Sequence, residues 1–393
     1  MEVKPQNSIK LAEDTITQNE LNALCDWIKA GSQLTKGPLT IEFEKKFSEY
    51  IGSDHTVLIN SGSSANLLMA YALLEGGYLK NKKVVVPSVS WITTLSPFLQ
   101  FGFETFLCEA DYENLGVDLN HLEEIFKKEE PSLLILVHVL GHANHMAEIQ
   151  TLCEKYGVLL IEDSCEALGS EYGGKKLGNL SVAGSYSFYY GHHISTIEGG
   201  AVVTNDRKLY NLMLSIRSHG WARDVDSNLK QAWKSEFDID DFREFYTFYY
   251  PGFNLRSTDL NAFLGISQLK LLPQISVARE KNFLLYKELL GKDYWSQKSK
   301  YDILSSFAYG TFVENRVEVF NHLKSKGIET RPLICGSMGL QPFWIKKFGK
   351  QNFKVADLVH NNGLYLPNHY YLTEEKIKMV CEVFSEKAIP KFL

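Results

Sequence analysis

The sequence predicts an α/β protein with a mostly parallel central sheet in a large domain, followed by a smaller C-terminal α/β domain. Short continuous apolar runs recur along the chain, which is typical of strands buried on both faces. Helix-like segments lie between these runs, as parallel strands require. At 393 residues, with 45% apolar and 22% charged content, the chain is long enough for both domains.

The N-terminal part of the chain opens with helical patterns. Thr17 and Glu20 have the spacing of a capping box, and apolar residues then recur every three or four positions, so an amphipathic helix is expected here. A second helix should follow the segment Asn60-Ser61-Gly62-Ser63-Ser64.

Strands are expected where the apolar runs are continuous, and the segments between them favour helices. The expected strands cover residues 84–86, 133–139, 158–161, 185–189 and 201–204, and the expected helices cover 121–128 and 146–156. A charged helix over 276–290 leads into shorter elements, so we place the domains at residues 1–270 and 271–393. The polar, acidic segment 224–244 is expected to be a mobile excursion that serves as a lid or a dimer-contact loop.

Composition argues against several classes of function. The net charge of −6 and the absence of a Lys/Arg-rich run disfavour nucleic acid as a partner. Residues 1–10 lack the apolar core of a signal peptide and no apolar run is long enough to span a bilayer, so we expect a cytoplasmic protein without a membrane partner. The six cysteines form no closely spaced pair, which disfavours disulfides, a metal site and an iron–sulfur cluster.

Two segments are candidates for phosphate binding. In the segment 60–65, small residues meet the start of a helix, where unpaired backbone N–H groups and the helix dipole favour an anion. An ordinary helix cap is the alternative interpretation of that segment. The glycine-rich segment 169–176 ends in Lys176 rather than Ser or Thr, so a glycine turn between strands is expected there.

Asp163 follows a buried strand, at the edge where open α/β sheets collect ligands. A carboxylate in this place can pair with a protonated pyridine nitrogen, although it can also simply cap the next turn. Trp91 lies just past another strand and is a candidate for stacking on a planar cofactor, with burial in the core as the alternative.

His192 and His193 are adjacent, with glycines nearby in the sequence. On a regular strand they would point to opposite faces, so at most one of them is expected to be catalytic. An ordinary imidazole pKa near 6.5 suits a group that both accepts and donates protons at neutral pH.

Six ordered motifs together resemble the vitamin B6-dependent sugar aminotransferases and dehydratases, a branch of the aspartate aminotransferase fold (fold type I). The motifs span nearly the whole chain and lie at 34–38, 60–65, 162–163, 187–200, 217–220 and 252–256. In that family the fifth residue after the serine of the Ser-Phe pair is the lysine that forms a Schiff base with the cofactor. Counting from Ser187, that position is His192, and an imidazole cannot form a Schiff base.

The resemblance therefore implies a 3-dehydratase that removes the C3 hydroxyl of a nucleotide-linked 4-keto-6-deoxy sugar. Two such subgroups are known. The sequence of the loop 187–200 and the scattered cysteines favour the one without an iron–sulfur cluster, which acts on a GDP-linked sugar of the mannose type. L-glutamate would convert pyridoxal 5'-phosphate to pyridoxamine 5'-phosphate, and His192 would move the proton during loss of the hydroxyl. Ammonia and a 4-keto-3,6-dideoxy sugar would be released.

The resemblance also implies roles for individual residues in a homodimer with shared active sites. Gly62, Ser63 and Ser187 would bind the cofactor phosphate, helped by Asn254 of the second subunit. Trp91 would stack on the ring and Asp163 would bond its nitrogen. Glu166 stands where the aminotransferases often have glutamine, so its contact with the cofactor is left open, and His219 and Arg256 are candidate accessory residues.

Two alternatives stay open at this point. One is an aminotransferase that makes a 4-amino sugar with a displaced lysine, such as Lys175 or Lys176. The other is a non-catalytic sensor that keeps the fold and binds a sugar nucleotide or the cofactor. The presence of Asp163, the phosphate segment and His192 together disfavours the sensor.

Overall fold

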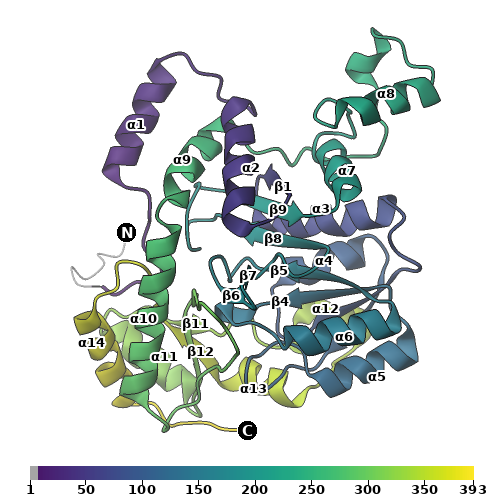
Figure 1. Cartoon of the computed structure of the whole chain (residues 1–393). Coiled ribbons are helices and arrows are strands. Elements are labelled where there is room, and N and C mark those ends of the chain that lie inside the picture. Colours follow the sequence, from purple (N-terminus) through teal and green to yellow (C-terminus); the bar gives the residue numbers. More distant parts are fainter. Residues whose placement is uncertain (1–7) are drawn as a thin grey trace.

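The computed structural model describes residues 8–393, and a seven-stranded sheet forms its centre (Figure 1). The spatial order of the strands is β1-β9-β8-β5-β4-β2-β3. β9 runs antiparallel to its neighbours β1 and β8, and the other neighbouring pairs are parallel, which confirms the mostly parallel sheet. The strands are β1 His55–Ile59, β2 Lys83–Pro87, β3 Glu104–Cys108, β4 Leu133–Val137, β5 Leu159–Asp163, β8 Ala183–Ser187 and β9 Gly200–Thr204.

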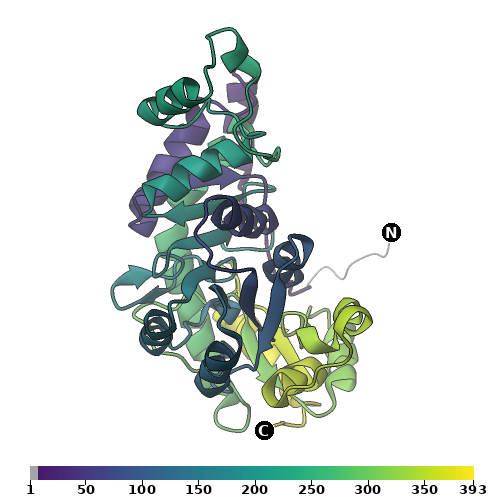
Figure 2. The same ribbon diagram turned by 90° about the vertical axis from the view of Figure 1, so that its right-hand side faces the viewer.

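Helices cover both faces of this sheet (Figures 1 and 2). In β4, Leu133 and Ile135 pack with the helices of one face, whereas Leu134 and Leu136 pack with those of the other. The first face carries α3 (Gly62–Glu75), α4 (Ile92–Gln100) and α7 (Arg207–Arg217), and the second carries α5 (Leu119–Glu129), α6 (Met146–Tyr156), α2 (Pro38–Ile51) and α9 (Asp259–Leu269). Because alternate side chains of a strand point to opposite faces, burial on both sides produces the continuous apolar runs of the sequence.

Several local predictions are confirmed. α1 (Gln18–Lys29) begins at Thr17 with the capping box, and α6 has the predicted bounds. The glycine-rich segment forms a hairpin of β6 (Glu171–Tyr172) and β7 (Lys175–Lys176), with φ of +59° and +73° at the two glycines of its turn. A left-handed backbone at both central positions explains why glycines stand there.

The C-terminal part has its own antiparallel sheet in the order β10 (Tyr309–Phe312), β12 (Gly363–Leu366), β11 (Arg331–Pro332). It is reached through α10 (Leu272–Leu290), and α11 (Arg316–Ser325), α12 (Pro342–Phe348), α13 (Lys354–Asn362) and α14 (Glu374–Ser385) complete this part. Ile9 packs into the same apolar core as Leu366 and Phe384, so the start of the described chain also belongs to it. The domain boundary at residue 270 stays a prediction.

The segment 224–244 projects from the body of the fold beside α7 (Figure 1). It contains α8 (Ser227–Glu236), and a short 3₁₀ turn follows at Arg243–Tyr246. Ion pairs of Lys230 and Lys234 with Glu244 join the helix to this turn. The excursion therefore has helical structure, and its mobility stays a prediction.

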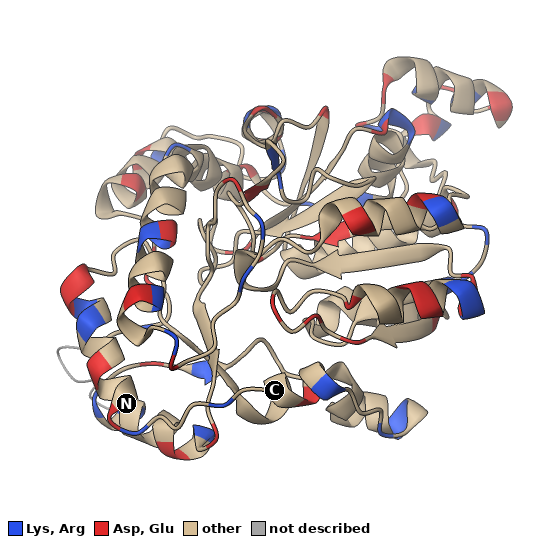
Figure 3. Cartoon of the chain, turned by 60° about the horizontal axis from the view of Figure 1, so that its bottom comes forward, with Lys and Arg blue, Asp and Glu red and all other residues tan. Residues whose placement is uncertain are grey.

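Acidic and basic residues are both spread over the outer helices (Figure 3). No helix within residues 8–393 has the length and apolar character needed to cross a membrane. The prediction that residues 1–10 form no signal peptide concerns a segment of which residues 1–7 lie outside the described part of the chain.

Candidate active site

A cavity of about 260 Å³ opens where β2, β4, β5 and β8 end. Ligand sites of open α/β sheets form at this carboxyl edge. Seven of the residues predicted for the site line the cavity, namely Gly62, Ser63, Trp91, Asp163, Glu166, Ser187 and His192.

Asp163 is the last residue of β5, and its carboxylate is held in place by hydrogen bonds. Oδ2 accepts from Asn66 Nδ2 and from Thr94 Oγ1, both at 2.7 Å, and Oδ1 accepts from the amide of Cys165 at 3.2 Å. Asn66 is itself fixed, because its Oδ1 accepts from Ser185 Oγ at 2.7 Å. A carboxylate fixed in this way at the cavity wall can pair with a cationic ring nitrogen.

The start of α3 forms another wall of the cavity. Ser61 caps the helix through a hydrogen bond from the Ser64 amide to its Oγ at 3.1 Å, and the first-turn amides of Gly62 and Ser63 have no helical carbonyl to bond. A Cβ atom at Gly62 would lie 2.6 Å from the Ser187 Cβ and 2.8 Å from the Cys165 Sγ. The backbone therefore approaches Ser187 closely, and the segment makes a cradle suited to an anion.

The two histidines have different surroundings. Residues 189–194 form turns and bends rather than a regular strand, so the strand argument for their separation does not apply. His192 lines the cavity and its Nδ1 lies 2.7 Å from the Cys165 carbonyl oxygen. His193 is fully buried, with Nε2 2.9 Å from the Ser305 carbonyl oxygen. Of the two, His192 is the one positioned to act on a ligand.

Because a carbonyl oxygen can only accept, the hydrogen of His192 must be on Nδ1. The Nε2 lone pair is then available for a proton. Burial lowers the pKa of His192 to about 4, and this outweighs the opposing effects of the Cys165 carbonyl and Asp163. The imidazole is consequently neutral at pH 7 and can act as a base.

Glu166 is half-buried in the cavity wall, and its Oε2 accepts from the Leu140 amide at 2.9 Å. Burial first, and then the negative charge of Asp163, raise the pKa of Glu166 to about 7. The site thus holds a carboxyl group that changes protonation near neutral pH.

Sequence reasoning missed several residues around the cavity. Asn66 and Thr94 were detectable in principle, because Asn66 lies one helical turn after Gly62 and Thr94 lies three residues after Trp91. Phe307, Arg331 and Tyr365 come from the C-terminal part, where no motif singled them out. Trp91 is 54% exposed, so it is not a core residue.

Three predicted residues lie outside the cavity. Arg256 donates from Nε to Asn254 Oδ1 at 3.1 Å, and its Nη2 lies 3.4 Å from His219 Nε2. Asn254, His219 and Arg256 therefore form one polar cluster, and none of the three lines the cavity. Lys175 and Lys176 also lie outside it, on the β6–β7 hairpin, where Lys176 pairs with Glu171.

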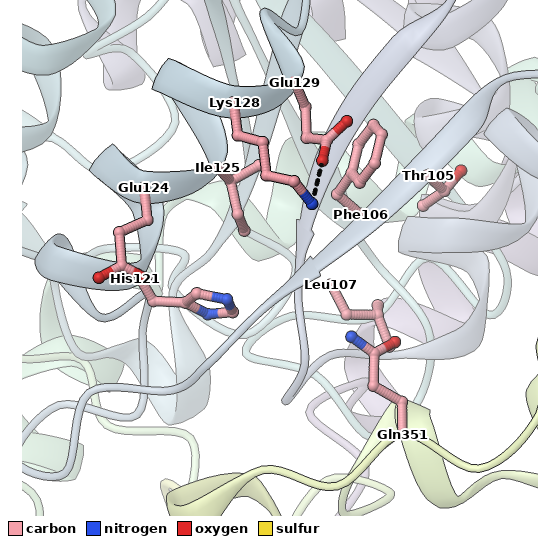
Figure 4. Close-up of a pocket in the computed structure, with 9 residues that line it drawn as sticks. All are labelled: Thr105, Phe106, Leu107, His121, Glu124, Ile125, Lys128, Glu129 and Gln351. Atoms are coloured by element: carbon pink, nitrogen blue, oxygen red, sulfur yellow. Dashed lines mark ion pairs between the residues drawn. The ribbon is translucent and has the colours of Figure 1, made fainter.

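Another hollow lies between α5 and the edge strand β3 (Figure 4). It is lined by residues such as His121 and Gln351, with Lys128 and Glu129 paired at 2.9 Å. None of the residues predicted for the site lies in it.

The sheet order, the small antiparallel sheet and the cavity at the strand ends define a pyridoxal phosphate enzyme of fold type I. The chain belongs to the DegT/DnrJ/EryC1/StrS aminotransferase family, whose model matches residues 15–385. Enzymes of this family depend on pyridoxal phosphate or its pyridoxamine form, and the chain is therefore assigned the same cofactor.

Relatives that carry an enzyme name are similar to this chain over nearly its whole length. It is 33% identical over 389 residues to the GDP-4-keto-6-deoxy-D-mannose 3-dehydratase of Yersinia pseudotuberculosis, covering 96% of this chain and 98% of that protein. It is 26% identical over 356 residues to a GDP-perosamine synthase of Escherichia coli O157:H7, covering 90% and 91%.

Solved structures show the same similarity. A GDP-4-keto-6-deoxymannose-3-dehydratase with a trapped pyridoxal phosphate–glutamate geminal diamine matches with a TM-score of 0.86 and 29% identity, covering 96% of this chain and 100% of that chain. A mutant of such a dehydratase with bound GDP-perosamine matches with a TM-score of 0.87 and 29% identity, covering 96% and 100%.

Proposed function

We propose that this protein is a sugar-nucleotide 3-dehydratase that removes the C3 hydroxyl of a 4-keto-6-deoxy sugar and releases ammonia. The observation that carries the proposal is the placement of His192, a neutral base, in the cavity that also contains Asp163 and the start of α3. At this position, aminotransferases of the family need a lysine.

The residues of the cavity fit pyridoxamine phosphate. Gly62, Ser63 and Ser187 would hold its phosphate, because the helix start offers unpaired amides and the Ser187 side chain lies directly against Gly62. Asp163 would hold the ring nitrogen, and Trp91 would cover the ring. When bound, the cofactor supplies an amino group for the C4 ketone and a ring that withdraws electrons.

His192 would remove a proton from carbon through Nε2. Its Nδ1–H remains bonded to the Cys165 carbonyl, which fixes the plane of the ring during the transfer. The imidazole is shorter and stiffer than a lysine side chain. We therefore expect it to return the proton less readily to the sugar carbon, which is the step that would complete an amino transfer.

No lysine lies among the described residues that line the cavity. This disfavours the rival aminotransferase, and the positions of Lys175 and Lys176 on an outer hairpin disfavour them as a displaced nucleophile. A stable 4-amino sugar formed from glutamate would nevertheless identify that rival.

The substrate is proposed from the relatives. Their names point to GDP-4-keto-6-deoxy-D-mannose, and the structure with trapped glutamate points to L-glutamate as the amino donor. Similarity of 29% to a Salmonella lipopolysaccharide biosynthesis protein is compatible with a role in making 3,6-dideoxy sugars.

A homodimer is part of the proposal. Asn254, His219 and Arg256 form a polar cluster outside their own chain's cavity, as expected if they complete the site of a second subunit. Trp91, Tyr189 and Ile197 are 54%, 48% and 50% exposed, and a second subunit would also cover such apolar surface.

The experiment is incubation of the holoenzyme with L-glutamate and a panel of nucleotide-linked 4-keto-6-deoxy sugars. Ammonia release that depends on the sugar, greatest with the GDP-linked mannose derivative, supports the proposal. Absence of ammonia with every sugar contradicts it.

A further inference from the structure

Three carboxyl groups lie on or just after the end of β5, and their surroundings differ. Glu162 is fully buried, and its carboxylate accepts from the amides of Gly178 and Leu180 and from Ser181 Oγ, all at 2.8 Å, and lies 2.9 Å from His138 Nε2. Asp163 accepts three hydrogen bonds, as described above. Donated hydrogen bonds of this kind stabilise the charged form of a carboxyl group.

The charged form of Glu166 is stabilised by fewer donated hydrogen bonds than that of Glu162 or Asp163. Among the described residues, its carboxylate accepts from the Leu140 amide, at a position with a left-handed backbone (φ +52°). The side chain lines the same cavity as His192, and the Cys165 carbonyl that fixes His192 belongs to the residue before Glu166. One short turn therefore positions both groups.

We propose that Glu166 is the acid of an acid–base pair whose base is His192, so that Glu166 enters the reaction protonated while His192 enters neutral. This proposal rests on the dehydratase function proposed above and assigns a second proton-transferring residue to the same site.

The charges around the pair support this assignment. Burial and Asp163 raise the pKa of Glu166, whereas burial, with a smaller effect of the Arg279 cation, lowers the pKa of His192. Surroundings that push two pKa values apart are a mark of separate acid and base roles. The other titratable or charged groups at this part of the cavity are Tyr365, Cys335, Cys165 and Arg331, and burial raises the pKa values of Tyr365 and Cys335 to about 12 and that of Cys165 well above its ordinary value.

The proton balance closes within the pair. His192 Nε2 takes the proton of the C–H bond that breaks, and the electron pair of that bond replaces the pair that leaves with oxygen when the sugar C3–O bond breaks. Glu166 gives its proton to the departing hydroxyl, which leaves as water. Transfer of a proton from the imidazolium to the carboxylate then restores both groups. Loss of the hydroxyl reduces the sugar by two electrons, which the pyridoxamine form of the cofactor would supply and L-glutamate would replace.

Infrared difference spectroscopy tests the protonation state directly. In wild type we expect a protonated-carboxyl band at pH 6 in both the holoenzyme and the cofactor-free protein, and in the cofactor-free protein the band should disappear with a midpoint near 7. The band should be absent from Glu166→Gln, whose amide oxygen can still accept from Leu140. It should persist in Glu280→Gln, the matched control, because burial also raises the pKa of Glu280, which does not line the cavity.

A second readout is the pH dependence of ammonia release. Wild-type activity should fall above pH 7 as Glu166 loses its proton, and Glu166→Gln should be slower by about 10²-fold or more without that fall. A band that titrates near pH 4 to 5, or one that survives in Glu166→Gln, overturns the proposal, as does unchanged turnover of that variant. If Glu166→Gln does not fold, wild type labelled with ¹³C-glutamate must still show a shifted band titrating near 7, or the proposal fails.

The infrared measurement also distinguishes failure of the Glu166 proposal from failure of the dehydratase function on which it rests. A protonated Glu166 in a protein that releases no ammonia would overturn the dehydratase function and the acid role, while the protonation state itself would stand.

Discussion

The Nδ1 atom of His192 lies 2.7 Å from the carbonyl oxygen of Cys165. This hydrogen bond fixes both the tautomer and the direction of the imidazole, since the carbonyl requires a donor. Cys165 lies between Asp163 and Glu166, so the same turn that carries the two cavity carboxyls also orients the base.

Replacing His192 removes the proposed base. His192→Asn should lower ammonia release by about 10²–10⁴-fold, the usual contribution of general acid–base catalysis. Cofactor retention should change little, because Asp163 and the start of α3 are untouched. The control is His322→Asn on α11, whose imidazole pairs with Glu386 and does not line the cavity, and comparable losses in both variants would show that His192 is not the base.

The cradle at Gly62 has no room for a side chain. Gly62→Ala should displace Ser187 and Cys165 and destabilise the fold by about 1–3 kcal/mol, as overpacking does. It should also weaken cofactor binding, measured by absorbance during dialysis. Gly191→Ala is the matched control, since its new Cβ would meet only the Tyr189 ring at 3.8 Å. Full cofactor retention by Gly62→Ala would contradict the cradle.

Thr94 is expected to matter through Asp163. Thr94→Val keeps the shape of the side chain but removes a 2.7 Å hydrogen bond to the carboxylate, a kind of bond worth about 1.5–3 kcal/mol. We expect the dissociation constant for pyridoxal phosphate to rise by about tenfold or more. Thr151→Val, at an exposed position of α6, should leave the dissociation constant unchanged. Equal affinity in both variants would show that Thr94 does not support Asp163.

The fold was predictable where burial is uniform. β4, β8 and β9 are fully buried and appear in the sequence as apolar or small-residue runs, and α6 follows its helical pattern. β3 was missed because it is one of the two edge strands, and its first residues, exposed Glu104 and half-buried Thr105, are polar and shorten the apolar run. β1, at the other edge of the sheet, was missed as well, since its first two residues, His55 and Thr56, are polar.

The parts of the site that were predictable are the cavity walls formed by a single sequence motif. The segments around Gly62, Asp163 and His192 each contain residues that the fold brings together. Arg331 and Tyr365 reach the cavity from the small sheet, and their positions follow from how the two parts of the chain pack, which no local pattern encodes. Asn254 lies outside its own cavity, so its proposed role needs a second subunit.

Acid should destabilise the protein through its buried histidines. Burial lowers the pKa of His142 to about 3, whereas an unfolded histidine titrates near 6.5, so the unfolded state binds more protons between these values. The stability is therefore complete above pH 6.5 and is lost as the pH falls toward 3. From pH 7 to pH 5 we expect a loss of about 2 kcal/mol from this group alone. Urea unfolding at the two pH values checks this, and His142→Gln should reduce the difference by that amount.

Shared active sites can be tested by mixing two inactive variants. If Asn254 acts in the partner's site, Asn254→Ala and His192→Asn subunits assembled together should place one intact site in each mixed dimer. Random pairing of equal amounts then restores about a quarter of the wild-type sites. No recovery after verified subunit exchange would place Asn254 outside the partner's site.

The central claim is removal of oxygen from the sugar without retention of nitrogen. The most direct measurement is mass spectrometry of the sugar nucleotide formed by the holoenzyme from GDP-4-keto-6-deoxy-D-mannose and ¹⁵N-glutamate. We expect a product that lacks one oxygen and carries no ¹⁵N, with the label recovered as ammonia. A product that keeps the C3 hydroxyl and carries ¹⁵N at C4 would contradict the dehydratase function and identify an aminotransferase.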